Sequence, residues 1–514
     1  MKSRFQALWL FCGAGALLLL AMGCNDTLRQ FITPIPPPTG DPGALAHAVT
    51  LSTNPATDGD GSDMHVNVSG DTSVGIVPVG ISPVFLGKAG SQLFVINDGD
   101  TTNPSAVTPP TVSFYIALLP QSRVTTTTLP APPSPDAAVK PVAGGTSSTG
   151  NIFIANRDSN NISVISANVL AVTATVPLPA SDAGPVMIAG NSANNQIFVV
   201  NQQSGTVTQI STLDNTVVRS IPVGSRPIWG VMSADGLFVF VVNQGDGTVS
   251  VIDTSSGTIV PCTTGPSCPG GNAIKVGAGA ASSPNFAFYD PKLQRVYVSN
   301  TGENTISVIN ANGISSTNPP VKLKDIPVSG TPTSVTALAN GTRAYAALGN
   351  CTPGVNHTTL LDASAANNLA SCNGNLVSII DAVGLRESGT LTVGAGAVSI
   401  DSSADSSKVF VISAHDITTI RDNVHAPNCT GSSCLPGPVQ PDRTFTSPSI
   451  SVIRASTSTV LATPADPSVV SRPLPTFHVP LQDPRCVPTI DPNFNNKVAI
   501  PCALQSPFVV RTFP

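Results

Sequence analysis

The residues best suited to chemistry are histidines and carboxylates in long segments outside any regular pattern. Half of the six histidines are among them. Imidazole and carboxylate groups bind metals and act as general acids or bases, so these side chains form the candidate binding face. Their spacing fits no metal-ligand motif, which favours the competing interpretation of solvated polar residues on loops. The members are Asp98, Asp100, His357, His415, Asp416, Arg421, Asp422 and His425.

A second acidic segment, Asp58–Asp63, has the alternating carboxylates of a calcium loop. It lacks the glycine at position six and the glutamate at position twelve that such loops use. A polar turn is the favoured interpretation, so no cofactor is expected, with calcium or another divalent ion as the alternative. No G-x-S-x-G nucleophile turn falls between a strand and a helix, and no catalytic residue is assigned.

The elements that must position these residues repeat along the chain. Seven short apolar tetrads open with an aromatic residue, and in five of them an asparagine stands three residues later. Another apolar strand follows each tetrad. Such self-similarity indicates a repeat fold in which each unit buries its faces against its neighbours. The asparagines are interpreted as structural strand-end residues. The tetrads begin at Phe94, Phe153, Phe198, Phe240, Tyr297, Tyr345 and Phe410.

One unit shows the expected strands most clearly. Pro227–Met232, Leu237–Asn243 and Val249–Asp253 are strands separated by turns, and Val217–Gly224 is the outer strand of the preceding unit. These strands form a four-stranded antiparallel meander. Seven such sheets around an axis predict an all-β, seven-bladed β-propeller, which leaves only short, protected edges.

The motifs of this unit resemble the YVTN repeat family of bacterial envelope propellers. Phe240–Asn243 followed by Gly247–Asp253 carries the resemblance, as do Tyr297–Asn300 with Asn304–Asn310, and Ile221–Gly224. The resemblance spans about Val74 to Ala462 and implies the propeller fold and an envelope location, while indicating no ligand. The sixth and seventh units depart from it, because Leu348 and Ser413 stand where asparagine is expected.

The N-terminus has the pattern of an export signal. Lys2 and Arg4 precede the apolar run Ala7–Leu20, and Ala21–Gly23 leads into Cys24. The run has signal-peptide proportions. The segment before Cys24 resembles a bacterial lipobox, which implies cleavage at that cysteine and its lipidation; a simple secretory signal is the alternative.

Four regions are therefore expected. Residues 1–23 are a lipoprotein-type signal peptide, 24–44 a lipidated cysteine with a Pro-rich tether, 45–470 the propeller, and 471–514 a Pro-rich extension that packs on it. The mature protein is predicted to be anchored to a membrane of the cell envelope, facing the periplasm or the exterior.

The cysteines fit an exported protein. Apart from Cys12 and Cys24, the eight cysteines fall into four pairs of sequence neighbours, which predicts disulfides. The pairs are Cys262 with Cys268, Cys351 with Cys372, Cys429 with Cys434, and Cys486 with Cys502.

The units differ in the connection between their second and third strands. It has five residues in units two to five but 15 in Asp98–Val112, 28 in Gly349–Leu376 and 36 in Ala414–Ser449. A seven-unit ring makes units six, seven and one consecutive, so all three long loops are expected to lie together on one face. Either Val74–Gly80 or Thr459–Thr463 would close the ring, with the N-terminal strand favoured.

The leading functional hypothesis is a non-enzymatic scaffold that binds an envelope protein or a glycan through these loops. A propeller enzyme of the lactonase or quinone- or metal-dependent oxidoreductase type is the alternative. The net charge of −5, with only 10% charged residues, excludes the basic surface that nucleic-acid binding requires.

Overall fold

The computed structural model describes residues 47–53, 60–67, 72–99, 108–116, 124–130, 139–263, 265–315, 317–351, 372–420, 443–455, 469–470 and 506–513. The chain divides into two units, Met1–Ala44 and Leu45–Pro514, and every described residue belongs to the second. The predicted signal peptide, Cys24 and the tether lie outside the described residues. None of the described helical residues forms a segment able to span a bilayer.

Seven antiparallel sheets are formed by consecutive strands, with the first strand of each at one edge and the last at the other. The first three sheets are β4 (Pro83–Ala89), β5 (Gln92–Asn97), β6 (Thr111–Ile116), β7 (Thr125–Thr128); β8 (Pro141–Thr146), β9 (Ile152–Asn156), β10 (Asn161–Ser166), β11 (Ala171–Pro177); and β12 (Pro185–Ala189), β13 (Gln196–Asn201), β14 (Thr206–Ser211), β15 (Thr216–Pro222). The next two are β16 (Pro227–Met232), β17 (Phe238–Asn243), β18 (Thr248–Asp253), β19 (Thr258–Ile259), with β20 (Ile274–Lys275) also paired to β18; and β21 (Pro284–Asp290), β22 (Arg295–Asn300), β23 (Thr305–Asn310), β24 (Val321–Pro327). The last two are β25 (Ser334–Ala337), β26 (Arg343–Leu348), β27 (Leu376–Asp381), β28 (Arg386–Thr392); and β29 (Ala397–Ser402), β30 (Lys408–Ile420), β31 (Arg443–Arg454), β32 (Val469–Val470).

An eighth sheet joins the two ends of the described chain. Its order is β33 (Ser506–Phe513), β1 (His47–Thr53), β2 (Asp60–Asn67) and β3 (Thr72–Ile81). The last strand pairs antiparallel with the first, with His47 opposite Phe513. The described residues thus form eight four-stranded or larger sheets, and the expected count of seven is corrected.

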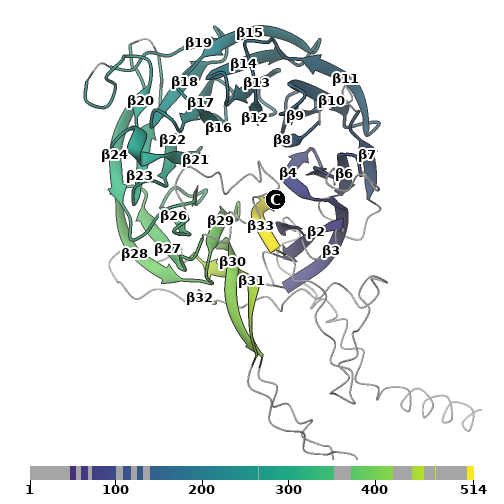
Figure 1. Ribbon diagram of the computed structural model, residues 1–514. Coiled ribbons are helices and arrows are strands. Elements are labelled where there is room, and N and C mark those ends of the chain that lie inside the picture. The colour runs from purple at the N-terminus through teal and green to yellow at the C-terminus, as the bar shows by residue number, and fades with distance from the viewer. Residues whose placement is uncertain are drawn as a thin grey trace, which may run out of the picture. The chain divides into compact units, whose positions relative to one another are not determined.

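The first strands of the sheets face a common centre (Figure 1). Contacts join β4 to β8, β8 to β12, and so on through β16, β21, β25 and β29 to β33, while β1 contacts β4 and closes the ring. The fold of this unit is therefore a β-propeller with its innermost strands around an axis. The single described helix is the 3-10 turn η1 (Ala280–Ser282).

The eighth sheet lacks the sequence marker that identifies the other seven. The aromatic tetrad marks the second strand of seven sheets, but in β1 the ladder register puts Val49, opposite His65, at the position of the aromatic, and the strand has no Phe, Tyr or Trp. Val74–Gly80 does lie in an outer strand, β3, but in the eighth sheet, whereas β32 is the outer strand of the seventh. Thr459–Thr463 lies outside the described residues. Part of the predicted C-terminal extension, β33, is the inner strand of the eighth sheet.

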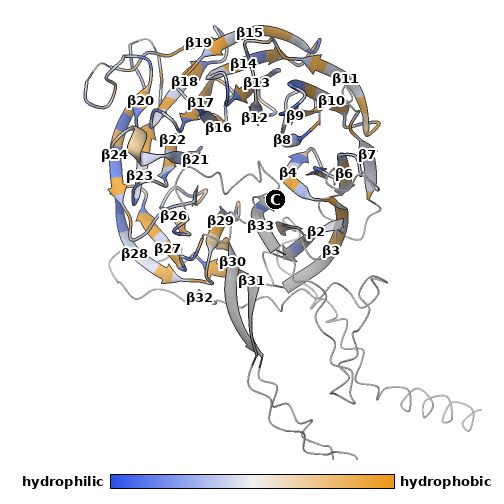
Figure 2. Cartoon of the chain, viewed as in Figure 1, coloured by the Kyte–Doolittle hydropathy of each residue, from blue (hydrophilic) through white to orange (hydrophobic). Residues whose placement is uncertain are grey.

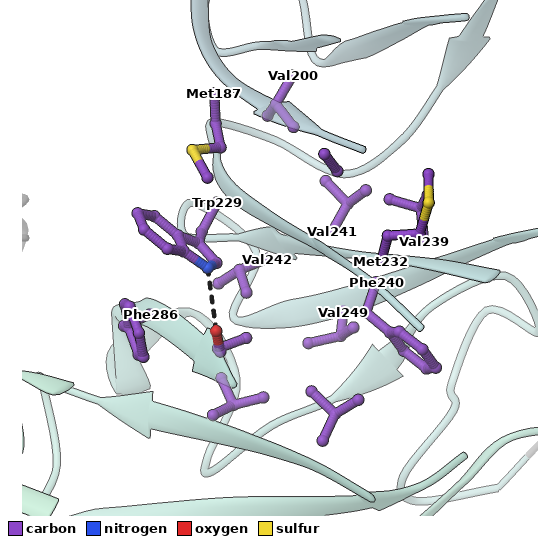
Figure 3. Packing of buried hydrophobic residues seen from close by; sticks show 14 of the residues in the cluster. Met187, Val200, Trp229, Met232, Val239, Phe240, Val241, Val242, Val249 and Phe286 are labelled. Carbon is purple, nitrogen blue, oxygen red and sulfur yellow. Dashed lines mark hydrogen bonds between the residues drawn. The ribbon is translucent and has the colours of Figure 1, made fainter. Parts of the chain in front are cut away.

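The core lies between neighbouring sheets. All seven tetrad aromatics are at most 1% exposed, because the second and third strands are covered on both faces by adjacent sheets. Figure 3 shows this packing around Phe240, Val241 and Trp229. The outer strands differ: β15 and β24 keep most of their residues partly or fully exposed. Figure 2 shows apolar and polar residues mixed along these outer strands.

The tetrad asparagines have a structural role. In five sheets the asparagine is buried and its Nδ2 group donates to hydroxyl or amide oxygens on the third strand. Asn243, for example, donates to Thr248 Oγ1 and Ser250 Oγ, each at 3.0 Å. A Cβ added to Gly224 would stand 2.7 Å from Asn243 Cγ, so the glycine of the Ile221–Gly224 motif makes room for the next sheet's asparagine. The asparagines therefore join strands rather than line a channel.

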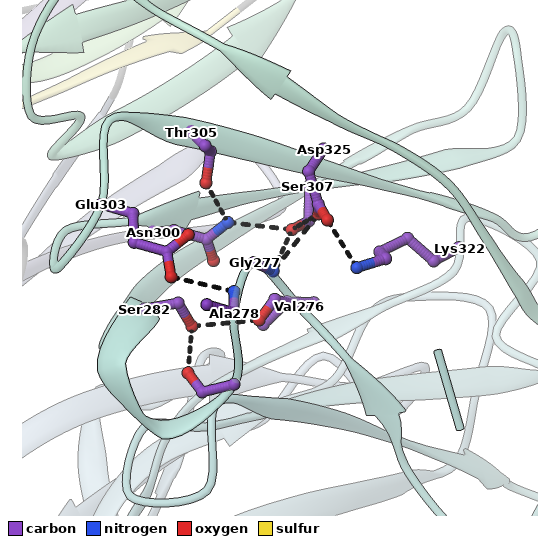
Figure 4. Close-up of polar contacts among 11 residues, drawn as sticks. Val276, Gly277, Ala278, Ser282, Asn300, Glu303, Thr305, Ser307, Lys322 and Asp325 are labelled. Carbon is purple, nitrogen blue, oxygen red and sulfur yellow. Dashed lines mark hydrogen bonds and ion pairs between the residues drawn. The ribbon is translucent and has the colours of Figure 1, made fainter. Parts of the chain in front are cut away.

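In two sheets a carboxylate extends this hydrogen-bonded cluster. Figure 4 shows Asn300 Nδ2 donating to Ser307 Oγ at 2.9 Å, and Ser307 Oγ donating to Asp325 Oδ1 at 2.5 Å. Lys322 pairs with the same aspartate at 2.6 Å. Asp182 ends the equivalent chain from Asn201 through Thr208.

Two of the four predicted disulfides are confirmed. Cys262 is bonded to Cys268, and Cys351 to Cys372. The first closes a short loop between β19 and β20, and the second joins the ends of the segment between β26 and β27. The other two predicted pairs lie outside the described residues.

Candidate functional site: the axial cavity

A cavity of about 480 Å³ lies where the inner strands converge. Residues of all eight inner strands line it, and its volume falls in the range of small-molecule sites. Its lining residues are mainly apolar and aromatic. A pocket of this kind, apolar with a few converging polar groups, is the default candidate for a binding site.

Glycines let the inner strands approach the axis closely. A Cβ added to Gly144 on β8 would lie 2.7 Å from the ring of Phe94, and one on Gly145 would lie 2.5 Å from Ile188 Cγ2. Both neighbours belong to adjacent sheets. Glycine in a strand often marks such a close approach. The cavity is therefore bordered by tightly packed sheets.

The charged residues of the described lining are Asp401, Arg511 and Lys88. They lie on β29, β33 and β4, which are three consecutive inner strands of the ring. Asp401 Oδ1 accepts hydrogen bonds from the Ser402 backbone N–H at 2.9 Å and from Thr336 Oγ1 at 3.4 Å. Two cations and one carboxylate thus give this wall a positive balance.

Arg511 is partly buried, and its charge is affected by that burial and by Asp401. Burial lowers the pKa of its guanidinium, and the negative charge of Asp401 acts in the opposite direction. Because an arginine starts from a very high pKa, it stays protonated near neutral pH. A desolvated cation that remains charged gains from a second anion in its vicinity.

Aromatic residues occupy the strands across the ring. The indole of Trp229 on β16 lies 4.7 Å from the Phe286 ring on β21, measured between centroids, at an interplanar angle of 43°. Trp229 Nε1–H donates to the Ala287 carbonyl at 3.0 Å, as Figure 3 shows. Tyr289 follows on β21, and its pKa is raised by burial and by the charges of Asp235 and Asp290. This wall offers ring surface to a ligand.

Three of the predicted binding-face residues, Asp98, His415 and Asp416, lie in the described part of the chain. Asp98 pairs with Lys140 at 2.9 Å, and the pKa of Asp98 is raised because burial outweighs this partner. His415 and Asp416 lie on β30. Asp100, His357, Arg421, Asp422 and His425 fall outside the described residues. Asp98 is not among the residues that line the cavity, and no group of three or more His, Cys, Asp or Glu in the described part of the chain could hold a metal.

The acidic segment of the calcium-loop hypothesis is only partly described. Asp60 and Asp63 lie on β2, so this part of the segment is strand rather than turn.

The arrangement of the three long loops is also corrected. Because the eighth sheet stands between the seventh and the first, the loops do not belong to consecutive sheets. They leave the ends of second strands, where Asn97 stands opposite Pro83 at the start of β4. Lys88, Tyr289 and Asp401 lie in the later halves of their inner strands, toward the opposite face. The polar end of the cavity and the strand ends from which the long loops leave are therefore at different faces.

Sequence analysis missed the cavity residues because they share no local pattern. Lys88 stands alone between Gly87 and Ala89, and Arg511 lies in a proline-rich tail. The available signal was the variation among inner strands, since Trp229 and Phe286 are large aromatics at the position where β8 has Ala143.

The comparisons with known proteins agree with the fold. No family model matches the chain, and no curated protein sequence does. Among solved structures, the dihydro-heme d1 dehydrogenase NirN in complex with DHE has a TM-score of 0.51 and 13% identity, covering 81% of this chain and 72% of its own.

Two further structures have 13% identity and a TM-score of 0.47, and each covers 68% of this chain. They are a functionally unknown protein from Desulfotomaculum acetoxidans, matched over 96% of its length, and the periplasmic gluconolactonase PpgL of Pseudomonas aeruginosa, matched over 95%. At these identities the likeness to NirN shows a shared propeller fold.

Proposed function

We propose that the protein binds a small organic molecule in its axial cavity and is a small-molecule propeller rather than a scaffold. The observation that carries the proposal is the cavity itself, with apolar and aromatic lining and three charged side chains gathered on one wall. This brings the chain closer to the enzyme alternative than to the binding-scaffold hypothesis.

The structural likeness to NirN also supports a propeller that binds a small molecule. NirN is a dehydrogenase whose structure holds a bound small molecule, DHE. A propeller enzyme is therefore the second part of the proposal. Lys88, Tyr289 and Asp401 are the groups of the cavity that would hold or move a proton, because they are its titratable side chains besides Arg511.

Tryptophan fluorescence tests the binding proposal directly. The chain has two tryptophans, Trp9 and Trp229, and only Trp229 lies in the described residues. In full-length Trp9→Phe protein, emission therefore reports on the cavity. We expect members of a library of small organic acids, lactones and quinones to change this emission and to raise Tm, since a ligand that binds only the folded state stabilises it.

The matched control is Trp229→Phe, which should still show the rise in Tm while its emission no longer responds. If no compound alters either signal, the proposal is wrong. Turnover of each binding compound, followed by mass spectrometry, then decides between a binding protein and an enzyme.

The cellular location is a separate part of the proposal. The YVTN resemblance and the segment before Cys24 support an envelope lipoprotein. We expect Cys24→Ala to abolish labelling by radioactive palmitate and to move the protein from the membrane to the soluble fraction. Cys12→Ala is the control and should change neither. Labelling of the Cys24→Ala protein would contradict lipidation at this residue.

One observation favours a partner surface in addition to the cavity. The ladder between β30 and β31 continues past the core of the sheet to Ile420 opposite Arg443. Figure 1 shows this pair of strands extending away from the ring. An envelope protein or glycan bound there would be lost from pull-downs when residues 416–447 are replaced by a short turn, while ligand binding in the cavity is kept.

A further inference from the structure

The cavity has two unlike walls on opposite sides of the ring. Its inner strands follow the order β4, β8, β12, β16, β21, β25, β29, β33. Four steps separate β33 from β16, and four separate β4 from β21, so these pairs face each other across an eight-membered ring. Figure 1 shows β16 and β21 across the centre from β33 and β4. Arg511 and Lys88 therefore lie on strands that face those of Trp229 and Phe286 across the ring.

We infer that the ligand is an aromatic carboxylate, whose carboxylate binds Arg511 and Lys88 while its ring lies against Trp229 and Phe286. The inference rests on the proposed function and names its substrate class. It does not require either cation to lack partners, because a ligand carboxylate joins the contacts that these side chains already make.

The cationic wall fits a carboxylate better than a neutral polar group. A guanidinium has five donors in one plane, so Arg511 can serve Asp401 and a second carboxylate together. Asp401 is held in place by Ser402 and Thr336, which keeps it beside Arg511. Lys88 adds a second positive charge on the adjacent inner strand.

The aromatic wall fits a flat apolar body. Trp229 Nε1–H is already bonded to the Ala287 carbonyl, so the indole contributes ring surface rather than a donor. Phe286 extends this surface, with its ring centroid 4.7 Å away. Aromatic rings prefer offset or edge-to-face neighbours at such distances, which an incoming ring can provide.

The position of Arg511 beside the other charged residues of the cavity depends on the closure of the ring. Arg511 lies on β33, the strand that follows all others in the described chain. The anion site is complete only when this strand pairs with β1. Arg511 on β33 and Lys88 on β4 thus bring two distant parts of the sequence together in one anion site.

Isothermal titration calorimetry with three matched probes tests the inference on the full chain in detergent at pH 7.5. The probes are 2-naphthoate, its neutral analogue 2-naphthamide, and cyclohexanecarboxylate, which keeps the charge but lacks an aromatic ring. We expect 2-naphthoate to bind about tenfold or more tightly than either of the others, because each lacks one wall's interaction.

Two variants assign the charge effect to the wall. Arg511→Gln should weaken 2-naphthoate about tenfold to 100-fold and leave 2-naphthamide unchanged. Lys88→Gln, on a different strand, should also weaken the binding of 2-naphthoate, but by a smaller factor. Arg511→Lys should recover part of the loss. Lys324→Gln, which removes an exposed charge from the outer strand β24, is the control and should change nothing.

The outcomes separate the two proposals. If 2-naphthamide binds as tightly as 2-naphthoate, or if Lys88→Gln and a folded Arg511→Gln protein both bind 2-naphthoate as wild type does, the inference is overturned and the proposed function stands. A library compound without a negative charge that binds more tightly than 2-naphthoate would also overturn the inference and leave the proposed function standing. If no probe and no library compound binds, both are overturned. Circular dichroism and Tm establish that each variant is folded.

Discussion

Polar side chains serve different purposes in the blades and on the axis. Within the blades, Asn201, Thr208 and Asp182 bond to one another and are fully buried. On the axis, Lys88, Asp401 and Arg511 border a cavity. The blade pattern recurs from sheet to sheet, whereas each cavity residue occurs once. Repetition therefore marks what every sheet needs for stability, and its absence marks the groups available to a ligand.

The largest expected effect concerns a carboxylate inside a blade. Asp182 accepts hydrogen bonds from Thr206 at 3.0 Å, Thr208 at 2.6 Å and Ser220 at 2.5 Å. Asp182→Ala removes a buried carboxylate and leaves three hydroxyls, among them the buried one of Thr208, without this acceptor. We expect a loss of about 3 kcal/mol in the free energy of unfolding, measured by urea denaturation.

The matched control is Asp214→Ala in the same sheet, where an exposed carboxylate accepts a hydrogen bond from Thr216 Oγ1 at 2.9 Å. Its loss should be much smaller. Equal losses for the two variants would mean that burial of the Asp182 hydrogen bonds adds nothing to the stability of the protein. Ligand binding in the axial cavity should be unchanged in both.

A comparison of two sheets refines the role of the asparagine. Asn243 stands opposite Thr248, whereas the equivalent pair in the sixth sheet is Leu348 opposite Leu376. Asn243→Leu leaves two hydroxyls without their donor and should cost about 2 kcal/mol in the free energy of unfolding.

The reverse exchange provides the counterpart. Leu348→Asn alone buries an amide beside a leucine and should destabilise the protein. The double variant Leu348→Asn, Leu376→Thr rebuilds the pair and supplies a donor to Ser378, whose Oγ is buried without a partner. A double-mutant cycle should therefore show favourable coupling between the two positions. Simple additivity would contradict the pairing.

A smaller effect should depend on pH. Asp290 is fully buried, and desolvation raises the pKa of its carboxyl above 3.8 despite bonds from the Lys292 and Leu293 backbone N–H groups. A raised pKa means that the folded state binds more protons, so this group's contribution to stability falls as pH rises from the unfolded toward the folded pKa.

Asp290→Asn removes this titration. The stability of wild type relative to Asp290→Asn should therefore decrease as pH increases from about 3.8 through the folded pKa, then stay constant. Thermal unfolding of both proteins across this range measures the difference. A constant difference throughout would show that Asp290 titrates alike in the two states.

The smallest expected change in stability belongs to the axis. Lys88→Gln should alter the free energy of unfolding by less than about 0.5 kcal/mol, since the side chain is partly exposed and borders a cavity. Its effect should instead be seen in ligand affinity. A large loss of stability would place Lys88 with the blade residues and remove the contrast between the two regions.

Much of the fold could be predicted from sequence because blade interiors repeat. Phe240 and Asn243 recur at equivalent positions, and their burial and bonding follow from the strand pattern. The eighth sheet could not be predicted this way, because β1 lacks the aromatic marker and its partner strand is more than 450 residues distant.

The cavity was harder to predict for a related reason. Which residues face one another across the axis depends on the number of sheets, and an assumed ring of seven gives the wrong pairs. Arg511 and Lys88 become neighbours only once β33 is placed in the ring. Histidines on long loops offered suitable chemistry, but the length of a loop gives no information about the inner strands.

The pairing of β33 with β1 also dictates an order of folding. His47 meets Phe513 only after almost the whole polypeptide has been synthesised. Contacts so distant in sequence form slowly and late. Seven sheets can assemble while the chain is still emerging from the ribosome, but the ring of sheets stays open until β33 has been synthesised. A shortened product would then carry a gap with unpaired strand edges, which proteases and chaperones recognise.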